Sequence, residues 1–73
     1  MSELLDFKVF CFEAYRTAKN LTGRQAMDLF EQYGVLDYLT ACYNVLHTTG
    51  RDYLIEDIDH FISVRRRAPA DTQ

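Results

Sequence analysis

The stretch from Leu29 to Ile62 constrains the fold more than any other, because two glycines divide a dense apolar pattern into helical lengths. Gly34 follows one apolar run, Gly50 follows a second, and acidic residues from Glu56 open a third. The apolar residues recur every three or four positions, which is typical of one face of an α-helix. Glycine just after such a run is a helix stop signal. The sequence therefore predicts an all-α fold, a compact bundle of three to four short helices.

Length and composition favour a single small domain. The chain has 73 residues, of which 48% are apolar, and a chain of this size has just enough apolar material for one core. We assign residues 1–67 to the helical domain and residues 68–73 to a disordered C-terminal tail. Cys11 and Cys42 lie inside apolar helical patterns and are expected to be small buried hydrophobes, with a disulfide as the less favoured alternative. Neither a signal peptide nor an apolar run of ~18 residues is present, so we expect a cytoplasmic protein and no membrane association.

The first predicted helix runs from Ser2 or Glu3 to Lys19 or Asn20, with Ser2 as its N-cap. An ordinary surface helix has one apolar stripe, whereas this helix has two. The first stripe contains Leu4, Phe7, Cys11, Ala14, Ala18 and Leu21, and the second contains Leu5, Val9 and Phe12. Such a helix is either central in its own chain or shared with another chain. Because a short chain cannot easily surround it, we predict a homodimer.

The boundaries of the second predicted helix are the best specified in the chain. Thr22 and Gln25 have the spacing of a capping box, in which each side chain accepts from the backbone N–H of the other residue. Gly34 is expected to end this helix in the left-handed conformation. Val35 then stands where such a helix end favours an apolar contact, here with Phe30.

The third predicted helix runs from about Leu36 to His47 or Thr48. We predict a short extended connector at Tyr53–Ile55, because three consecutive large apolar residues do not fit one helix face. The last predicted helix starts at Glu56 or Asp57 and reaches the three consecutive arginines at 65–67. Its acidic residues at the start and its arginines at the end both interact favourably with the helix dipole.

Three segments of the chain carry a resemblance to a known family. They are YGVLDYL at 33–39, the pair Leu46-His47, and YLIEDIDHFI at 53–62. With these segments the chain resembles, over about 12–62, a family of short bacterial proteins classed as a domain of unknown function. The family pattern has an acidic residue before the Leu-His pair, at the position where this chain has Asn44. Members sometimes neighbour genes for ADP-ribosyltransferase-like toxins, so the resemblance implies a helper or antitoxin-like role.

The reactive side chains favour structural roles over catalytic ones. Glu56 and His60 are four residues apart and could form a two-ligand metal clip, but a helix start at Asp57 explains the same acidic group more simply. His47 ends a helix and is expected to form a structural hydrogen bond. Both cysteines lie in apolar stripes, where the thiolate is disfavoured. We therefore expect a non-enzymatic protein without a metal or cofactor. A metal-dependent domain is the least favoured of the three functions considered.

The charge distribution argues against a general nucleic-acid-binding surface. The net charge is −3, and residues 1–64 hold five of the eight basic and ten of the eleven acidic side chains. The second and third predicted helices have helix-turn-helix proportions, but the third carries no Arg or Lys to contact phosphates. The alternative function is a small nucleic-acid-associated regulator that uses the remaining basic cluster, which consists of Arg65, Arg66 and Arg67.

The favoured function is a protein-interaction module, acting as an accessory or antitoxin-like regulator of a partner protein. Tyrosine is enriched at interfaces because it combines a large contact area with a polar tip. Exposed apolar and tyrosine surface of the first and third helices would contact the partner, and the acidic body would attract a basic one. The predicted interface residues are Leu5, Val9, Phe12, Tyr15 and Tyr38.

Overall fold

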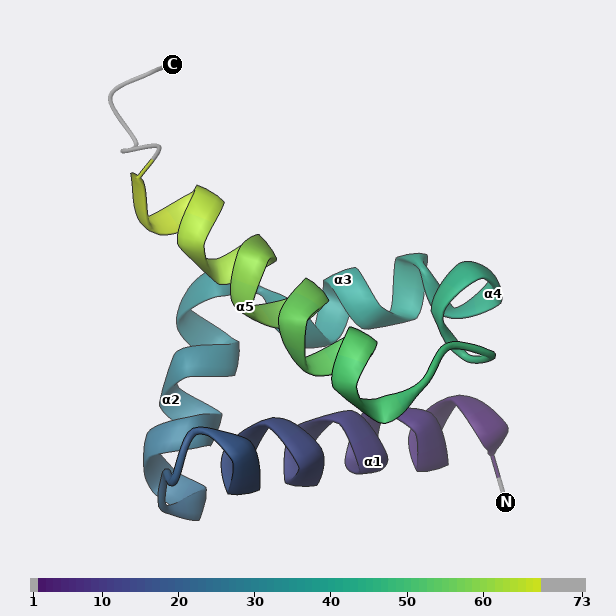
Figure 1. Cartoon of the computed structure of the whole chain (residues 1–73), viewed down its shortest axis with the longest axis horizontal. Helices are drawn as coiled ribbons and strands as arrows, with labels where there is room; N and C mark the ends of the chain where they lie inside the picture. Colours follow the sequence, from purple (N-terminus) through teal and green to yellow (C-terminus); the bar gives the residue numbers. More distant parts are fainter. Residues whose placement is uncertain (1, 68–73) are drawn as a thin grey trace.

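Residues 2–67 of the computed structural model are described here, and they form five helices and no strand (Figure 1). The helices are α1 (Glu3–Ala18), α2 (Gly23–Tyr33), α3 (Val35–Ala41), α4 (Tyr43–Leu46) and α5 (Arg51–Arg67). The prediction of a compact all-α bundle is confirmed, with one helix more than expected. The disordered tail predicted at 68–73 lies outside the described residues. Among the residues described, no helix is long and apolar enough to cross a membrane.

The helix ends that the sequence predicts from local hydrogen bonding are present. The Ser2 hydroxyl accepts from the backbone N–H of Leu5 at the start of α1. At the start of α2, Thr22 Oγ1 accepts from the Gln25 N–H at 3.0 Å, and Gln25 Oε1 accepts from the Thr22 N–H at 2.9 Å. Gly34 ends α2 with φ at 69°, in the left-handed region. These caps satisfy backbone groups that would otherwise lack partners at the helix ends.

The prediction of one continuous third helix is wrong, because the chain forms two helices there, separated at Cys42. This residue has φ −104° and ψ 15°, outside the helical range, and it separates α3 from α4. Its carbonyl accepts from the N–H groups of both Val45 and Leu46, so the chain turns without losing its hydrogen bonds. The turn places Leu46 in the core and leaves Val45 72% exposed.

The extended connector predicted at Tyr53–Ile55 is also wrong, because α5 begins at Arg51 and includes these residues. A backbone hydrogen bond from the Leu54 N–H to the Gly50 carbonyl closes the first turn at 3.0 Å. Of the three apolar residues, only Leu54 is buried, whereas Tyr53 is 56% exposed. Three adjacent apolar residues fit a helix when one faces the core and another faces solvent. The link between α4 and α5 is the turn at 47–50.

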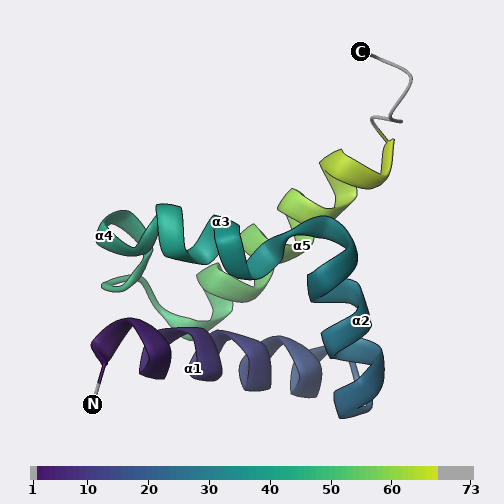
Figure 2. The same ribbon diagram turned by 180° about the vertical axis from the view of Figure 1, so that it is seen from behind.

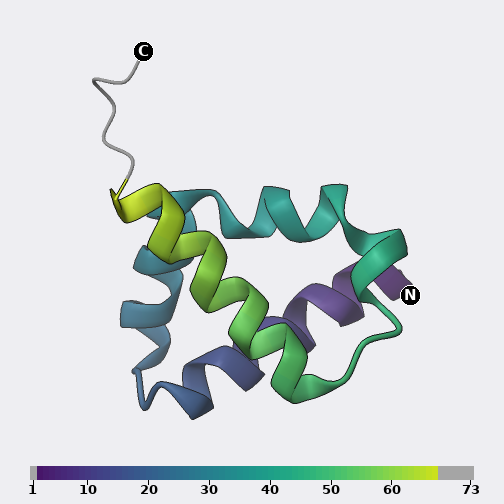
Figure 3. The same cartoon turned by 45° about the horizontal axis from the view of Figure 1, so that its top comes forward.

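The helices are arranged so that α5 crosses a frame made by the other elements. In Figure 3, α1, α2 and α3 follow one another around three sides of the molecule, and α5 runs diagonally between them. From behind, α1 and α3 lie on opposite sides, with α2 connecting them at one end (Figure 2). The contact of α5 with α1 is the most extensive between any two helices. The last helix therefore completes the core.

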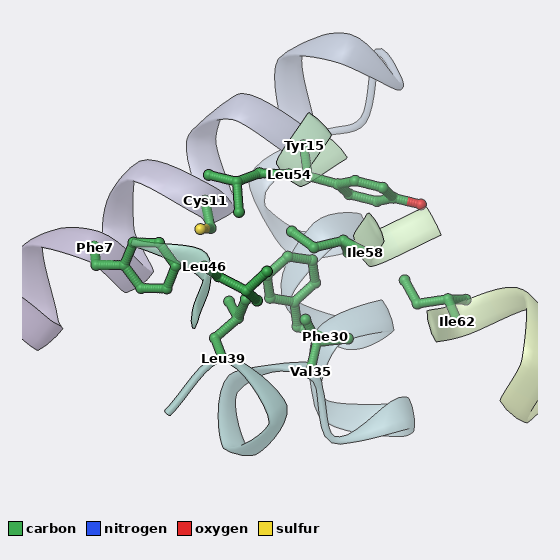
Figure 4. Close-up of a cluster of buried hydrophobic side chains, with 10 residues drawn as sticks. All are labelled: Phe7, Cys11, Tyr15, Phe30, Val35, Leu39, Leu46, Leu54, Ile58 and Ile62. Carbon is green, nitrogen blue, oxygen red and sulfur yellow. The ribbon is translucent and has the colours of Figure 1, made fainter. Parts of the chain in front are cut away.

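The core takes side chains from all five helices (Figure 4). Four of them are completely buried, namely Phe30, Val35, Leu39 and Ile58. The ring of Phe30 meets Phe12 edge-on at 5.4 Å and Tyr15 at 5.8 Å. On α1 the first predicted stripe supplies the buried residues Phe7, Cys11 and Ala14, while Leu5 and Val9 of the second stripe are each 53% exposed. The chain thus surrounds only part of α1.

Candidate functional site

Two acidic residues of α5 each accept a hydrogen bond from a tyrosine, and the two tyrosines lie on different neighbouring helices. Tyr15 on α1 donates its hydroxyl to Asp59 Oδ1 at 2.8 Å, and Tyr38 on α3 donates to Asp57 Oδ2 at 2.6 Å. The prediction that Asp57 caps the start of the last helix is wrong, because α5 begins at Arg51. The two aspartates therefore join α5 to α1 and to α3.

Asp59 accepts two hydrogen bonds, and they determine its titration. Lys19 Nζ donates to Asp59 Oδ2 at 3.0 Å, in addition to the bond from Tyr15. Partial burial alone would raise the pKa of Asp59, but the two hydrogen bonds and the charges of Lys19 and Arg66 outweigh it and lower the pKa below its ordinary value of 3.8. Burial and the neighbouring carboxylate raise the pKa of Tyr15 above its ordinary value of 10.0. The pair is therefore a neutral hydroxyl bound to a carboxylate at neutral pH.

A cavity of about 300 Å³ with a mixed polar and apolar lining lies where α1, α2 and α5 meet, beside this pair. Lys19 and Arg66 line it together with Tyr15 and Asp59. Its charged groups already have partners, because Lys19 pairs with Asp59, and Arg66 donates from Nε to the Tyr33 hydroxyl at 3.3 Å. These internal contacts reduce the attraction that the cavity would otherwise exert on a charged ligand.

The arginine cluster predicted as a nucleic-acid candidate forms the last turn of α5. The guanidinium of Arg65 stands 4.6 Å from the centre of the Phe61 ring, and that of Arg66 stands 5.6 Å from the centre of the Tyr33 ring. Arg67 is exposed. Two of the three arginines are thus held against aromatic rings of their own chain.

His47 forms a hydrogen bond of the structural kind that the sequence predicts. Its Nδ1 lies 2.7 Å from the carbonyl oxygen of Tyr43, and since a carbonyl only accepts, this nitrogen carries the proton. The imidazole ring stacks on the Tyr43 ring at 4.5 Å. Glu56 and His60 are both exposed, and residues 2–67 contain no group of three His, Cys, Asp or Glu side chains that could hold a metal ion.

Both cysteines are free thiols with different environments. Cys11 is 1% exposed, and burial raises its thiol pKa from 9.0 to about 11. Cys42 is half-buried at the turn between α3 and α4. A high thiol pKa leaves little of the reactive thiolate at neutral pH, so Cys11 is a weak nucleophile.

The exposed side of α1 borders an apolar groove of about 260 Å³, which we call the α1 groove. Leu5, Val9 and Phe12 form one wall, at the spacing of successive turns along one side of a helix. Met27 of α2 and Leu36 of α3 form the opposite side. The remaining lining residue is Lys8, whose long aliphatic stem covers apolar surface while its charge reaches solvent.

Of the five predicted interface residues, the structure brings three together at the α1 groove and places two elsewhere. Tyr15 is only 2% exposed, with its hydroxyl on Asp59. Tyr38 stacks on Phe61 with 4.0 Å between the ring centres. Burial, and to a smaller extent the hydrogen bond to Asp57, raise the pKa of Tyr38 above the ordinary 10.0. The sequence interpretation did not include Met27 or Leu36 among the interface residues. The position of Met27 just outside the buried stripe of α2 was the available signal.

Comparison with known proteins identifies the family but not a function. A model of the family described as "Protein of unknown function (DUF3791)" matches residues 6–65. The chain therefore belongs to this family, and the expected resemblance to a domain of unknown function is confirmed over a longer range than 12–62. No curated protein and no solved structure matches the chain.

Proposed function

We propose that this chain is a non-enzymatic protein-interaction module, an accessory or antitoxin-like regulator that binds a partner protein through the α1 groove. The observation that carries the proposal is the second apolar stripe of α1. Leu5 and Val9 are each 53% exposed although they adjoin Phe12, Met27 and Leu36, so apolar surface is continuous here. Single exposed apolar residues are ordinary, but a contiguous patch on a small protein is often a binding site.

The shape of the α1 groove fits an α-helix of the partner. Its wall follows α1 from Leu5 to Phe12, a distance of about 10 Å at the helical rise. That length accepts two or three apolar side chains from successive turns of a second helix, which is how amphipathic helices bind to grooves. We therefore assign the occupant as the apolar face of a partner helix, which would bury the exposed halves of Leu5 and Val9.

The homodimer predicted from the sequence would place a second copy in the same position. The chain has a net charge of −3, so two identical copies repel each other, whereas a basic partner is attracted. Charge therefore favours a different protein as the occupant. The cytoplasmic location and the absence of enzymatic activity expected from the sequence are parts of this proposal.

The test uses a synthetic amphipathic helix of about 15 residues with one leucine stripe and a neutral polar face. Binding of the fluorescein-labelled peptide to the full chain is followed by fluorescence anisotropy. We expect a micromolar dissociation constant that Val9→Gln weakens about fivefold, because burying the exposed half of a valine contributes about 1 kcal/mol.

Val45→Gln is the matched control, because Val45 is 72% exposed on α4 and does not line the α1 groove. Both substitutions replace exposed valines and should change the stability of the chain by less than about 0.5 kcal/mol. Sedimentation equilibrium of the unliganded chain tests for the second copy. Equal loss of binding in both variants, or no binding at about 1 mM protein, would contradict the proposal.

A further inference from the structure

A second hollow, with two carboxylates in its lining, adjoins the α1 groove at Leu36. This hollow, of about 250 Å³, is lined by Phe30, Glu31, Gly34, Leu36 and Asp37, where α2 turns into α3. Because Leu36 lines both spaces, a helix in the α1 groove that extends past Leu36 would approach the two carboxylates. We call Glu31 and Asp37 the acidic end of the groove.

The helix that carries Glu31 aligns it with the apolar lining of the α1 groove. Glu31 follows Met27 by four residues on α2, so both side chains lie on one side of that helix. Asp37 follows Leu36 directly in the first turn of α3. Both acids are exposed, and neither forms an ion pair with a basic group of residues 2–67.

We propose that the partner helix carries a lysine or arginine one or two turns beyond its apolar stripe, and that Glu31 and Asp37 bind this cation. The inference rests on the proposed function, since it names the chemistry of the occupant of the α1 groove. The apolar stripe of the partner supplies most of the affinity, and the cation fixes the direction in which the helix lies. A helix of opposite direction would place its basic end away from the two carboxylates.

The expected preference is modest, because exposed ion pairs contribute little in water. Two such pairs favour the basic peptide over a neutral one by roughly three- to tenfold, and the preference decreases with added salt. A peptide with acidic residues in the same place is disfavoured by a similar factor, because like charges repel.

The experiment compares three labelled peptides with the same leucine stripe and with two lysines, two glutamines or two glutamates after it. Affinities for the full chain are measured at low and high salt. We expect the order lysine, glutamine, glutamate. The chain carrying Glu31→Gln and Asp37→Asn should bind all three peptides alike, within about twofold. The matched control carries Asp52→Asn and Glu56→Gln, which change the net charge equally at exposed positions of α5 that line neither space.

The outcomes separate this inference from the proposed function. If all three peptides bind with Val9-dependent affinity but without a charge preference, the inference is wrong and the proposed function stands. If the control variant removes the preference as fully as the Glu31 and Asp37 variant does, net charge is responsible and the acidic end is not a site. If no peptide binds, both proposals fail. Self-association that competes with the lysine peptide would identify a second copy as the occupant and overturn the inference.

Discussion

Replacement of Tyr15 by Phe tests whether the tyrosine–aspartate pair holds α5 on α1. The substitution keeps the ring, which is 2% exposed in the core, and removes only the hydroxyl that donates to Asp59. Because no cavity forms, the loss is that of one hydrogen bond to a charged acceptor, about 1.5–3 kcal/mol in general. The Asp59 side chain is 47% exposed and keeps Lys19, so water can replace the hydroxyl. We therefore expect about 1–1.5 kcal/mol, a fall in Tm of about 5–10 °C.

The measurement is urea and thermal unfolding followed by far-UV circular dichroism. Tyr53→Phe is the matched control, because Tyr53 is 56% exposed and its hydroxyl donates to no group of residues 2–67. A double-mutant cycle with Asp59→Asn assigns the loss to the pair. If Tyr15→Phe is as stable as the original chain, or if the cycle shows no coupling, the structural role assigned to the pair is wrong.

The pH dependence of the same variant gives an independent check. The pKa of Asp59 is below 3.8 in the folded chain, so its contribution to stability is fully present above about pH 5 and is lost as the pH falls through the folded value. Without the Tyr15 hydroxyl the depression is smaller. The difference in stability between the original chain and Tyr15→Phe should therefore be constant near neutrality and decrease below pH 3.8. A difference that is unchanged down to pH 2.5, about one unit lower, would contradict this reasoning.

Three further predictions concern other parts of the chain. An added Cβ meets open space at both Gly34 and Gly50, but only Gly34 of the two has a positive φ. Gly34→Ala should therefore lower the free energy of unfolding by about 1 kcal/mol and Gly50→Ala should change it little; equal effects in urea titrations would be inconsistent with the helix end described. A thiol reagent should modify Cys42 well before Cys11, and mass spectrometry of partly labelled chain shows the order. Alanine at all three positions of Arg65–Arg67 should leave duplex DNA binding at low salt as weak as before; salt-sensitive binding that this variant loses would support the nucleic-acid alternative.

The parts of the fold that depend on local hydrogen bonding were predictable. Thr22, Gln25 and Gly34 form their caps from residues within one turn, and the structure confirms them. The turn at Cys42 was not predictable, because no glycine or proline stands between Val35 and Leu46 to mark a helix end. The assignment of Tyr53–Ile55 failed because the sequence alone does not show which of three apolar neighbours faces the core.

The candidate site was predictable in part for the same reason. The periodicity of α1 separates Leu5 and Val9 from the buried stripe without any knowledge of other helices. The opposite wall comes from α2 and α3, so Met27 and Leu36 become lining residues only when the helices pack. Tyr15 differs because a hydrogen-bond acceptor, Asp59, lies far along the chain and lets the whole side chain be buried.

The most direct test of the α1 groove is photo-crosslinking in the native host. A photoreactive phenylalanine analogue replaces Val9 in one full-length chain and Val45 in another, and crosslinked peptides are identified by mass spectrometry. The account predicts one second polypeptide joined at position 9, through a helix in which an apolar stripe precedes a lysine or arginine, and no such product at position 45. Equal crosslinking at both positions, or a product at position 9 that contains only a second copy of this chain, would contradict it.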